Sequence, residues 1–409
     1  MTTQVKPRRI LIHDYAGHPF QIQLSRELAS RGHTVQHVHS ASVQTPQGAL
    51  NRRSDDAGGF DVQAIRLPAT IEKVAYFRRY WQERDYGRRL AGVVRDFRPA
   101  VVISANTPLE AQAKALHAAR SVNARFVFWL QDILSVGFER LLRAELGIAG
   151  HLAARRFRAL ELRVLRASDH VVAISDAYLR ALASFGVPPH SITVIENWAS
   201  MKELPMLARD NPWAREHGLS RKLCFLYSGT LGLKHDPELL VALAMQYRAN
   251  DDVAVVVVSE GAGADYVARR KGELRLVNLL ILPFQPYTAL AHVMASADVL
   301  VALLEPAAGV FSVPSKVLSY LCAGRALLLA VPADNLAAKI VQRSASGIVV
   351  DPGNSDAFLL AAEHLRNSPD VRGAMAANAI KYASKTFDID MIGDRFESLI
   401  GSMECGSGG

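Results

Sequence analysis

The chain has 409 residues, half of them apolar, and a formal net charge of +8. This length favours two domains with sizeable cores, and the modest positive charge is compatible with nucleic acid, an anionic membrane or a phosphorylated substrate. The three cysteines lack metal-ligand or redox spacing, the N-terminus has no apolar signal core, and no run of 18 uncharged apolar residues occurs. These features predict a cytoplasmic protein without a membrane-spanning helix.

Short strand-forming runs alternate with helical patterns in the first half of the chain. We predict strands at 9–13, 34–39, 100–104, 126–130, 170–174 and 192–195, with helices between them such as 20–31 and 109–121. Apolar strands joined by helices are typical of a parallel sheet covered on both faces. His37 and His39 alternate on one strand, and without a third ligand nearby we predict half-buried or exposed edge residues rather than zinc ligands.

The segment 199–213 has no clear period and is predicted to be a linker. The alternation then resumes, with strands at 223–227, 253–258, 279–282, 299–303, 326–330 and 347–350. The sequence therefore predicts an α/β protein with two Rossmann-like, doubly wound parallel-sheet domains, 1–198 and 214–385, that face a central ligand cleft. A last helix at 386–404 is expected to return to the N-terminal domain.

The stretch FLYSGTLGLKHDPELL (225–240) places a glycine-containing turn between a strand and a helix. Glycine lets the backbone approach an anion, and the start of the next helix offers free N–H groups and the positive end of its dipole. Lys234 would add a positive charge at a diphosphate. The turn is not a GxxxxGK[ST] loop, and an ordinary tight turn is the alternative.

A second candidate phosphate site lies in GVFSVPSKVLSYLCAGRALLL (309–329). Pro314 precedes a predicted helix start, Ser315 is a candidate N-cap, and Gly324 is expected to end the helix. Lys316 falls in the first turn, where its charge opposes the helix dipole. This indicates an anion nearby, and the alternative is an exposed lysine that tolerates the position at small cost. Two such helix starts in one domain favour a nucleotide diphosphate as ligand.

Three segments of the second half, YSGTLGLKHDPELLVALA, LPFQPYTALAHVMASADVLVALLE and VPSKVLSYLCAGRALLLAVP, resemble the donor-binding half of retaining family-4 glycosyltransferases of the GT-B fold. The bacterial exopolysaccharide and O-antigen branch is the most similar. In the first half, HDYAGHPFQIQLSRELASRGHTV and VVAISDAYLRALASFGVPPHSITVIENW resemble the family's opening and closing segments. The resemblance rests on the order and spacing of these motifs.

The resemblance implies a role for each matched residue. By this resemblance, the catalytic residues would be Asp132 and Lys234. The donor would be bound by Gly17, Gly229, Thr230, Gly232, Lys234, Phe284, Gln285, Pro314, Ser315, Lys316 and Ser319. The acceptor side would contain Asp14, His18, Asn106 and Gln131. The family needs neither a metal nor a cofactor, so none is expected here.

Several positions depart from the family pattern. Thr230 stands where many members have an arginine, and Gln131 stands where a histidine is frequent. The two glutamates of the Glu-x7-Glu motif are replaced by Phe311 and Ser319, and Glu305 is the nearest possible substitute. Since the second glutamate usually binds the ribose hydroxyls, these departures bear on the identity of the donor and on activity itself.

Residues 151–166 predict an amphipathic helix in the first domain. Its apolar side would contain Ala153, Phe157, Leu160 and Val164. Its basic side would contain Arg155, Arg156, Arg163 and Arg166. This basic side is either a solvated surface or a surface that meets anionic lipid headgroups or a lipid diphosphate.

Together these features predict a cytoplasmic enzyme on the inner face of the cell membrane. It would transfer a sugar from a nucleotide-diphosphate donor, expected to be a UDP-sugar, to a glycan or polyprenyl-diphosphate-linked acceptor in polysaccharide biosynthesis. No nucleic-acid-binding module is recognisable, so nucleic acid is not an expected partner. The alternatives are a nucleotide-sugar epimerase of the same fold, an inactive nucleotide-sugar-binding partner, and a scaffold at the membrane surface.

Overall fold

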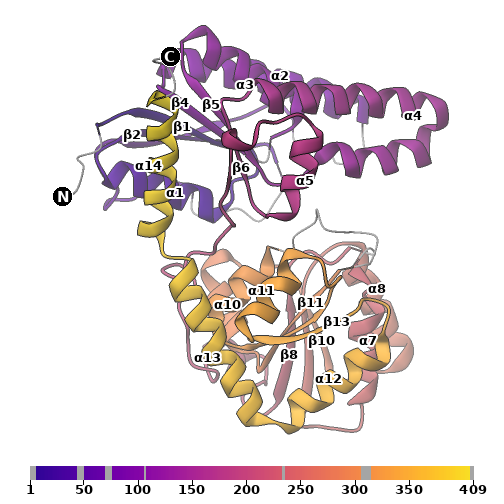
Figure 1. The fold of residues 1–409 in the computed structure, drawn as a ribbon. Helices are drawn as coiled ribbons and strands as arrows, with labels where there is room; N and C mark the ends of the chain where they lie inside the picture. The colour runs from indigo at the N-terminus through magenta and orange to yellow at the C-terminus, as the bar shows by residue number, and fades with distance from the viewer. Residues whose placement is uncertain are drawn as a thin grey trace. The chain divides into compact units, whose positions relative to one another are not determined.

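A computed structural model of the chain describes residues 6–43, 50–69, 76–105, 107–232, 235–304 and 315–405. The chain divides into two compact units (Figure 1). Unit 1 comprises Met1–Glu196 and Ile389–Gly409, and unit 2 comprises Asn197–Asp388. Each unit contains one parallel sheet with helices on its faces, and the predicted fold class is confirmed.

Unit 1 is built on seven parallel strands. In chain order they are β1 (Arg9–Asp14), β2 (Thr34–Ser40), β3 (Phe60–Ile65), β4 (Val101–Ala105), β5 (Arg125–Leu130), β6 (His170–Ala173) and β7 (Ile192–Val194). Their order in the sheet is β3-β2-β1-β4-β5-β6-β7. The chain extends the sheet to one side of β1 and then returns to the other side at β4. Ligands of such sheets bind outside the carboxyl ends of the strands at this reversal, which we call the switch point.

The helices of unit 1 are α1 (Pro19–Ser30), α2 (Tyr76–Phe97), α3 (Leu109–Ser121), α4 (Leu134–Ala167), α5 (Ala177–Ser184), the 3₁₀ turn η1 (Pro189–Ser191) and α14 (Ile389–Cys405). Side chains of β1 and β2 show which face of the sheet two of the helices cover. Ser25 of α1 bonds to the Nδ1 of His37 at 2.8 Å, and Tyr86 of α2 bonds to the Nε2 of His13 at 2.9 Å. His37 is paired with Ile12, and successive side chains of a strand point to opposite faces, so α1 and α2 cover opposite faces.

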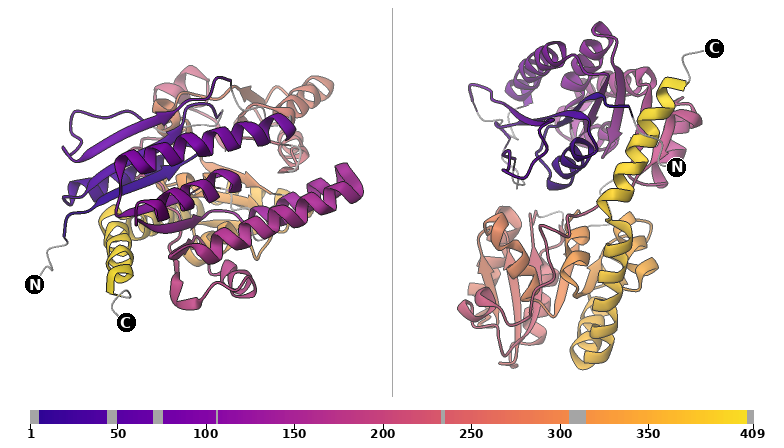
Figure 2. Two further views of the ribbon diagram at one scale, coloured as in Figure 1. Left: turned by 90° about the horizontal axis from the view of Figure 1, so that it is seen from above. Right: turned by 90° about the vertical axis from the view of Figure 1, so that its left-hand side faces the viewer.

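The C-terminal helix α14 packs against α1 within unit 1 (Figure 2). The Arg31 guanidinium lies 2.6 Å from the carboxylate of Asp394 and 2.7 Å from that of Glu397. The ring of Phe396 is buried, with its centroid 5.0 Å from that of Trp129 on β5. A charged contact and an aromatic contact therefore hold the last helix to this unit.

The prediction of half-buried or exposed edge positions for His37 and His39 is wrong. Both side chains are buried, because β3 pairs with β2 and makes β2 an interior strand. The sequence FDVQAI of β3 alternates apolar and polar residues weakly, and this strand was not among the predicted ones. Burial lowers the pKa of His37 to about 3, so His37 is a neutral core residue.

Unit 2 contains six parallel strands in the order β10-β9-β8-β11-β12-β13. They are β8 (Leu223–Ser228), β9 (Val253–Val258), β10 (Leu279–Leu282), β11 (Val299–Leu303), β12 (Ala326–Ala330) and β13 (Gly347–Val350). The helices of this unit are α6 (Pro212–Glu216) before the first strand, α12 (Ser355–Asn367) and α13 (Pro369–Thr386) after the last, and, between the strands, α7 (Glu238–Gln246), α8 (Ala262–Leu274), the 3₁₀ turn η3 (Tyr287–Ala289), α9 (Leu290–Ala295), α10 (Lys316–Ala323) and α11 (Leu336–Ser344). The switch point of this sheet lies between β8 and β11.

Helix α4 reverses direction, although it is helical over 34 residues. The buried carboxylate of Glu161 accepts hydrogen bonds from the N–H of Leu134 at 2.8 Å and of Ser135 at 3.2 Å. A straight helix would separate Leu134 and Glu161 by about 40 Å at its rise per residue. The helical segment must therefore fold back between Ser135 and Glu161 (Figure 1).

The fold of α4 also changes the predicted faces of residues 151–166. The buried side chains are Ala154, Glu161, Val164 and Leu165, whereas Ala153 is exposed. The predicted apolar side is therefore rotated about the helix axis. A hydropathy pattern could not find the buried stripe, because a glutamate that accepts backbone N–H groups is part of it.

Candidate active site

A glycine turn follows β8 at the switch point of unit 2. Gly229 has a φ of 124°, and a Cβ atom there would lie 3.3 Å from the Cε of Lys316, so both conformation and space favour glycine. The N–H of Gly229 donates to the carbonyl of Val258 at 3.0 Å, and the N–H of Gly232 donates to the Nδ1 of His235 at 2.8 Å. Two amides of the turn thus already have acceptors within the fold, and Thr230 is exposed between them.

Lys316 is the first residue of α10, and its amino group lies beneath this turn. Its Nζ is 3.7 Å from the centroid of the Tyr227 ring, donates to the Tyr227 hydroxyl, and lies 3.4 Å from the Thr230 carbonyl oxygen. Burial lowers the pKa of Lys316 to about 7. Within the described ranges of the chain, no carboxylate pairs with this amino group. An anion bound at the turn would supply the missing negative charge.

Tyr320 fixes α10 to the end of β8. Its hydroxyl accepts the N–H of Ser228 at 2.9 Å and donates to the carbonyl of the same residue at 3.1 Å. Ser315 stands at the N-cap position, but its side chain makes no capping bond because its backbone is already helical, with φ −56° and ψ −24°. Ser319 is half-buried on the same helix, and Gly324 ends the helix in the left-handed conformation, as predicted.

The loop after β10 lies beside the end of β9. The N–H of Phe284 donates to the carboxylate of Glu260 at 3.1 Å, and the side chain of Phe284 is 36% exposed. The side-chain oxygen of Gln285 accepts the indole N–H of Trp213 at 3.2 Å. The structure thus places the two predicted donor residues of this loop at the carboxyl edge of the sheet.

Asp14 shapes the loop that follows β1 in unit 1. Its buried carboxylate accepts the N–H of Ala16 at 3.0 Å and the N–H of His18, while Gly17 has a φ of 79°. Burial alone would raise the pKa of Asp14, but the charge and hydrogen bonds of His18 outweigh it and lower the pKa. Burial would lower the pKa of His18, but the negative charge of Asp14 and its hydrogen bond to the His18 side chain raise it. Asp14 therefore organises the loop, and His18 is its partner.

Asp132 is exposed in the loop between β5 and α4, and contacts on both sides hold this loop. The buried Tyr178 donates to the carbonyl of Gln131 at 2.9 Å. On the other side, Glu161 accepts the N–H groups of Leu134 and Ser135. Sequence reasoning did not identify Tyr178 or Glu161, because neither stands in a motif and both act through backbone groups distant in sequence.

A cavity of about 160 Å³ lies at this edge of unit 1. Its aromatic lining comes from Tyr15, Phe128, Trp129 and Phe157. Its polar lining comes from Arg79, Glu83, Thr107, Gln131 and Asp132. The cavity thus adjoins the carboxyl ends of β1, β4 and β5, which include the switch point of the sheet.

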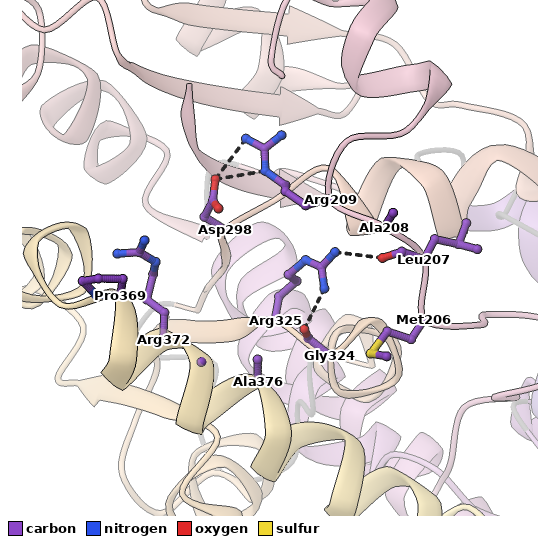
Figure 3. Close-up of a pocket in the computed structure, with 11 residues that line it drawn as sticks. Met206, Leu207, Ala208, Arg209, Asp298, Gly324, Arg325, Pro369, Arg372 and Ala376 are labelled. Carbon is purple, nitrogen blue, oxygen red and sulfur yellow. Dashed lines mark hydrogen bonds and ion pairs between the residues drawn. The ribbon is translucent and has the colours of Figure 1, made fainter. Parts of the chain in front are cut away.

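A larger cavity, of about 490 Å³, lies near the amino ends of β11 and β12 in unit 2 (Figure 3). Arg325 donates to the carbonyls of Ala295 at 2.9 Å and Gly324 at 2.9 Å, at the ends of α9 and α10. Arg209 pairs with Asp298 at 3.0 Å. An arginine that binds the last carbonyls of helices stabilises those helix ends. We therefore assign Arg325 a structural role and do not place a substrate in this cavity.

Five residues named in the sequence analysis are not described by the structure. Lys234, Asn106, Pro314, Phe311 and Glu305 lie outside the described residues. Among the residues that are described, no group of three or more His, Cys, Asp or Glu side chains could hold a metal ion. In the same part of the chain, no helix is long and apolar enough to cross a bilayer.

Comparison with solved structures shows where this fold occurs. HepE from Anabaena, in complex with UDP and glucose, has a TM-score of 0.70 at 15% identity and covers 97% of this chain and 100% of its own. Sucrose-phosphate synthase from Thermosynechococcus elongatus has a TM-score of 0.71 at 15% identity, covering 98% and 100%. WaaG, a glycosyltransferase involved in lipopolysaccharide biosynthesis, has a TM-score of 0.65 at 14% identity, also covering 98% and 100%.

Two family models match the sequence in succession. Residues 21–198 match the glycosyl transferase 4-like domain, and residues 211–385 match the glycosyl transferases group 1 domain. The chain belongs to the family-4 glycosyltransferases of the GT-B fold. No curated protein matches this glycosyltransferase in sequence. The predicted family-4 and GT-B assignment and the enzyme class are confirmed, and the group 1 match contains the turn after β8 and the start of α10.

Proposed function

We propose that this glycosyltransferase binds a UDP-sugar at the switch point of unit 2. The observation that carries the proposal is the amino group of Lys316, which lies beneath the Gly229–Thr230 turn without a carboxylate partner among the described residues. A nucleotide diphosphate supplies two phosphates for this amino group and for the amino-terminal end of α10. HepE, which has the same fold, was solved with UDP-glucose, and this supports uridine as the base.

The reaction we propose is transfer with retention to a glycan or polyprenyl-diphosphate-linked acceptor in polysaccharide biosynthesis. The bond between the anomeric carbon and the diphosphate oxygen breaks, and a bond from the acceptor oxygen forms on the same face. The acceptor proton passes to the departing diphosphate. Lys316 stabilises the charge of that diphosphate, Asp132 orients the acceptor hydroxyl from unit 1, and Lys234 is proposed as a second cation at the turn.

We further propose that α4 brings the enzyme to an anionic membrane surface on the cytoplasmic side. Arg155, Arg156 and Arg163 are exposed, and Leu152 is 63% exposed on the same helix. Arg166 is also exposed, but its Nε donates to the carbonyl of Phe185 at 2.5 Å, so it is partly used within the fold. Clustered arginines near an apolar side chain are typical of surfaces that bind anionic lipids.

Calorimetric titration and thermal unfolding with uridine, UMP, UDP and a panel of UDP-sugars test the donor site. We expect UDP to bind about tenfold or more tightly than UMP, because the second phosphate adds charge-assisted bonds. Ligands that bind only the folded enzyme must also raise its melting temperature. Absence of both effects with every uridine nucleotide would contradict the proposal.

The Asp132→Asn variant tests the transfer step. We expect transfer to fall about 100-fold while UDP affinity stays within about twofold, because Asp132 lies in unit 1 and the diphosphate site in unit 2. Asp176→Asn is the matched control, since Asp176 is exposed and makes no side-chain capping bond. An altered sugar released without any acceptor would instead identify an epimerase.

Co-sedimentation with phosphatidylglycerol vesicles tests the membrane proposal. The triple variant with Arg155, Arg156 and Arg163 changed to Gln should lose most of the binding, at about 1 kcal/mol per arginine near the surface. Arg88→Gln with Arg89→Gln is the control, because these arginines are also exposed but pair with Asp85 on α2. Equal losses in both variants would argue against a specific surface on α4.

A further inference from the structure

Tyr227 lies near the end of β8 and contacts both parts of the candidate diphosphate site. Its ring is buried in the core of unit 2, and its hydroxyl donates to the carbonyl of Thr230 at 2.8 Å. The amino group of Lys316 lies 3.7 Å from the centroid of the same ring and donates to the same hydroxyl. A single buried side chain therefore joins the glycine turn to the first residue of α10.

Lys316 is held in one place before a ligand arrives. Its Nζ contacts the ring and the hydroxyl of Tyr227 and lies 3.4 Å from the Thr230 carbonyl oxygen. A cation is attracted to the face of an aromatic ring, and the hydroxyl gives it a hydrogen-bond acceptor. A lysine side chain that is already ordered loses less rotamer freedom when it binds an anion. Tyr227 therefore lowers the entropic cost of binding a phosphate at Lys316.

Tyr227 also fixes the direction of the Thr230 carbonyl. Gly229, directly before Thr230, has a φ of 124°, and glycine has access to many other conformations. A carbonyl oxygen that faced a bound phosphate would repel it, because both carry negative charge. The Tyr227 hydroxyl keeps this oxygen turned towards the side chain of Tyr227. Burial raises the pKa of Tyr227 well above its usual range, so the hydroxyl keeps the proton that it donates.

We infer that Tyr227 is a positioning residue of the donor site, whose ring and hydroxyl hold Lys316 and the Thr230 carbonyl in the arrangement that a diphosphate requires. The inference rests on the proposed donor function. Tyr227 itself touches no substrate, because its side chain is 0% exposed. Its hydroxyl also favours the ammonium form of Lys316, and it thereby sets the pH range in which a diphosphate binds.

Tyr227→Phe tests the role of the hydroxyl, since this change keeps the ring. Calorimetric titration of the full chain with UDP at pH 7 should give an affinity about fivefold below that of the wild type, because Lys316 and the turn are less ordered. Tyr247→Phe is the matched control, since Tyr247 is a buried tyrosine of the same core whose hydroxyl donates to Glu363 at 2.9 Å. Both variants should have a lower melting temperature, as the loss of a buried hydrogen bond predicts, but only Tyr227→Phe should lose UDP affinity.

The number of protons taken up with UDP separates positioning from a general loss of stability. Burial lowers the pKa of Lys316 to about 7, and within the described ranges no charged group shifts it further. Burial raises the pKa of both Tyr227 and Tyr320, so neither hydroxyl titrates at neutral pH. Titrations at pH 7 in buffers of different ionisation enthalpy should show uptake of about half a proton by the wild type. Tyr227→Phe should take up close to one, because loss of the acceptor disfavours the ammonium form in the free protein.

The donor proposal and the role of Tyr227 can fail separately. If the wild-type chain does not bind UDP, the proposed function is wrong and Tyr227 has no part in it. If UDP binds but Tyr227→Phe matches the wild type in affinity and proton uptake, the donor proposal survives and the role of Tyr227 is wrong. Lower affinity with the proton uptake of the wild type, or an equal loss of affinity in Tyr247→Phe, would also overturn the inference, because the hydroxyl would then act through the fold of unit 2.

Discussion

The first six strands of unit 1 follow the same order as the six strands of unit 2, but the two switch points differ in their chemistry. Both place the first strand next to the fourth, with strands two and three on the far side. In unit 2, the first strand ends in a glycine turn over Lys316, a cation without a carboxylate partner among the described residues. In unit 1, the first strand ends in Asp14, and an exposed carboxylate, Asp132, follows β5.

This difference shows that topology fixes where a ligand binds, while a few side chains fix what binds there. In the proposed donor site of unit 2, Lys316 would offer positive charge to a diphosphate. In unit 1, the carboxylate of Asp132 and the ion pair of Arg79 and Glu83 line the cavity. A transferase needs both properties, because its donor carries the charge and its acceptor carries the nucleophilic hydroxyl.

The largest effect should come from removing the cation of unit 2. Lys316→Met keeps the length of the side chain but removes its charge. We expect UDP affinity to fall about 100-fold, since one charge-assisted bond to phosphate contributes about 1.5–3 kcal/mol. The free energy of unfolding should not decrease, because burial of this ammonium group is unfavourable in the free protein. Calorimetric titration with UDP and thermal unfolding measure the two effects.

The stability of this variant should depend on pH in a defined direction. The pKa of Lys316 is about 7 in the folded chain and 10.5 ordinarily. Between these values the unfolded chain binds one more proton, so wild-type stability rises with pH relative to the variant. The advantage of Lys316→Met should therefore be largest below about pH 7. Lys339→Met, at an exposed lysine of α11, is the control and should change neither quantity.

A somewhat smaller effect should appear in the pH dependence of donor binding. At pH 8 most of the free protein has a neutral Lys316, whereas a bound diphosphate favours the ammonium form. UDP should therefore take up close to one proton, and its affinity should fall up to about tenfold per pH unit above pH 7. Titrations between pH 7.5 and 9 in buffers of different ionisation enthalpy measure this, since the phosphate is already ionised there. Proton uptake that persists in Lys316→Met would assign the titration to another group.

The same comparison shows what the sequence could predict. Continuous apolar runs such as AVVVV gave the six strands of unit 2 nearly to the residue, and Lys316 was identified by its position in a first helical turn. Its place beneath the Gly229 turn depends on how α10 packs on β8, for example through the contact of Lys316 with Tyr227, which is 89 residues away in sequence, and no local pattern encodes this. Glu161 could not be identified from the sequence either, because a glutamate in a helix rich in arginine is typical of a solvent-exposed face.

The smallest effect we expect to resolve concerns the two contacts that hold the Asp132 loop in unit 1. Glu161→Gln removes the charge that caps the start of α4, and Tyr178→Phe removes the hydrogen bond to the Gln131 carbonyl. Each should lower stability by about 1–2 kcal/mol, as loss of a helix cap or a buried hydrogen bond does. Each should also lower transfer several-fold while leaving UDP affinity unchanged, because the loop lies in the other unit.

A double-mutant cycle decides whether these contacts position Asp132 or only stabilise the fold. If both act through the loop, their effects on transfer should be less than additive, because the first change already releases the loop. In an Asp132→Asn background, both changes should lose their effect on transfer and keep their effect on stability. Additive losses of transfer that persist without the Asp132 carboxylate would show that Glu161 and Tyr178 act on the fold of unit 1 as a whole.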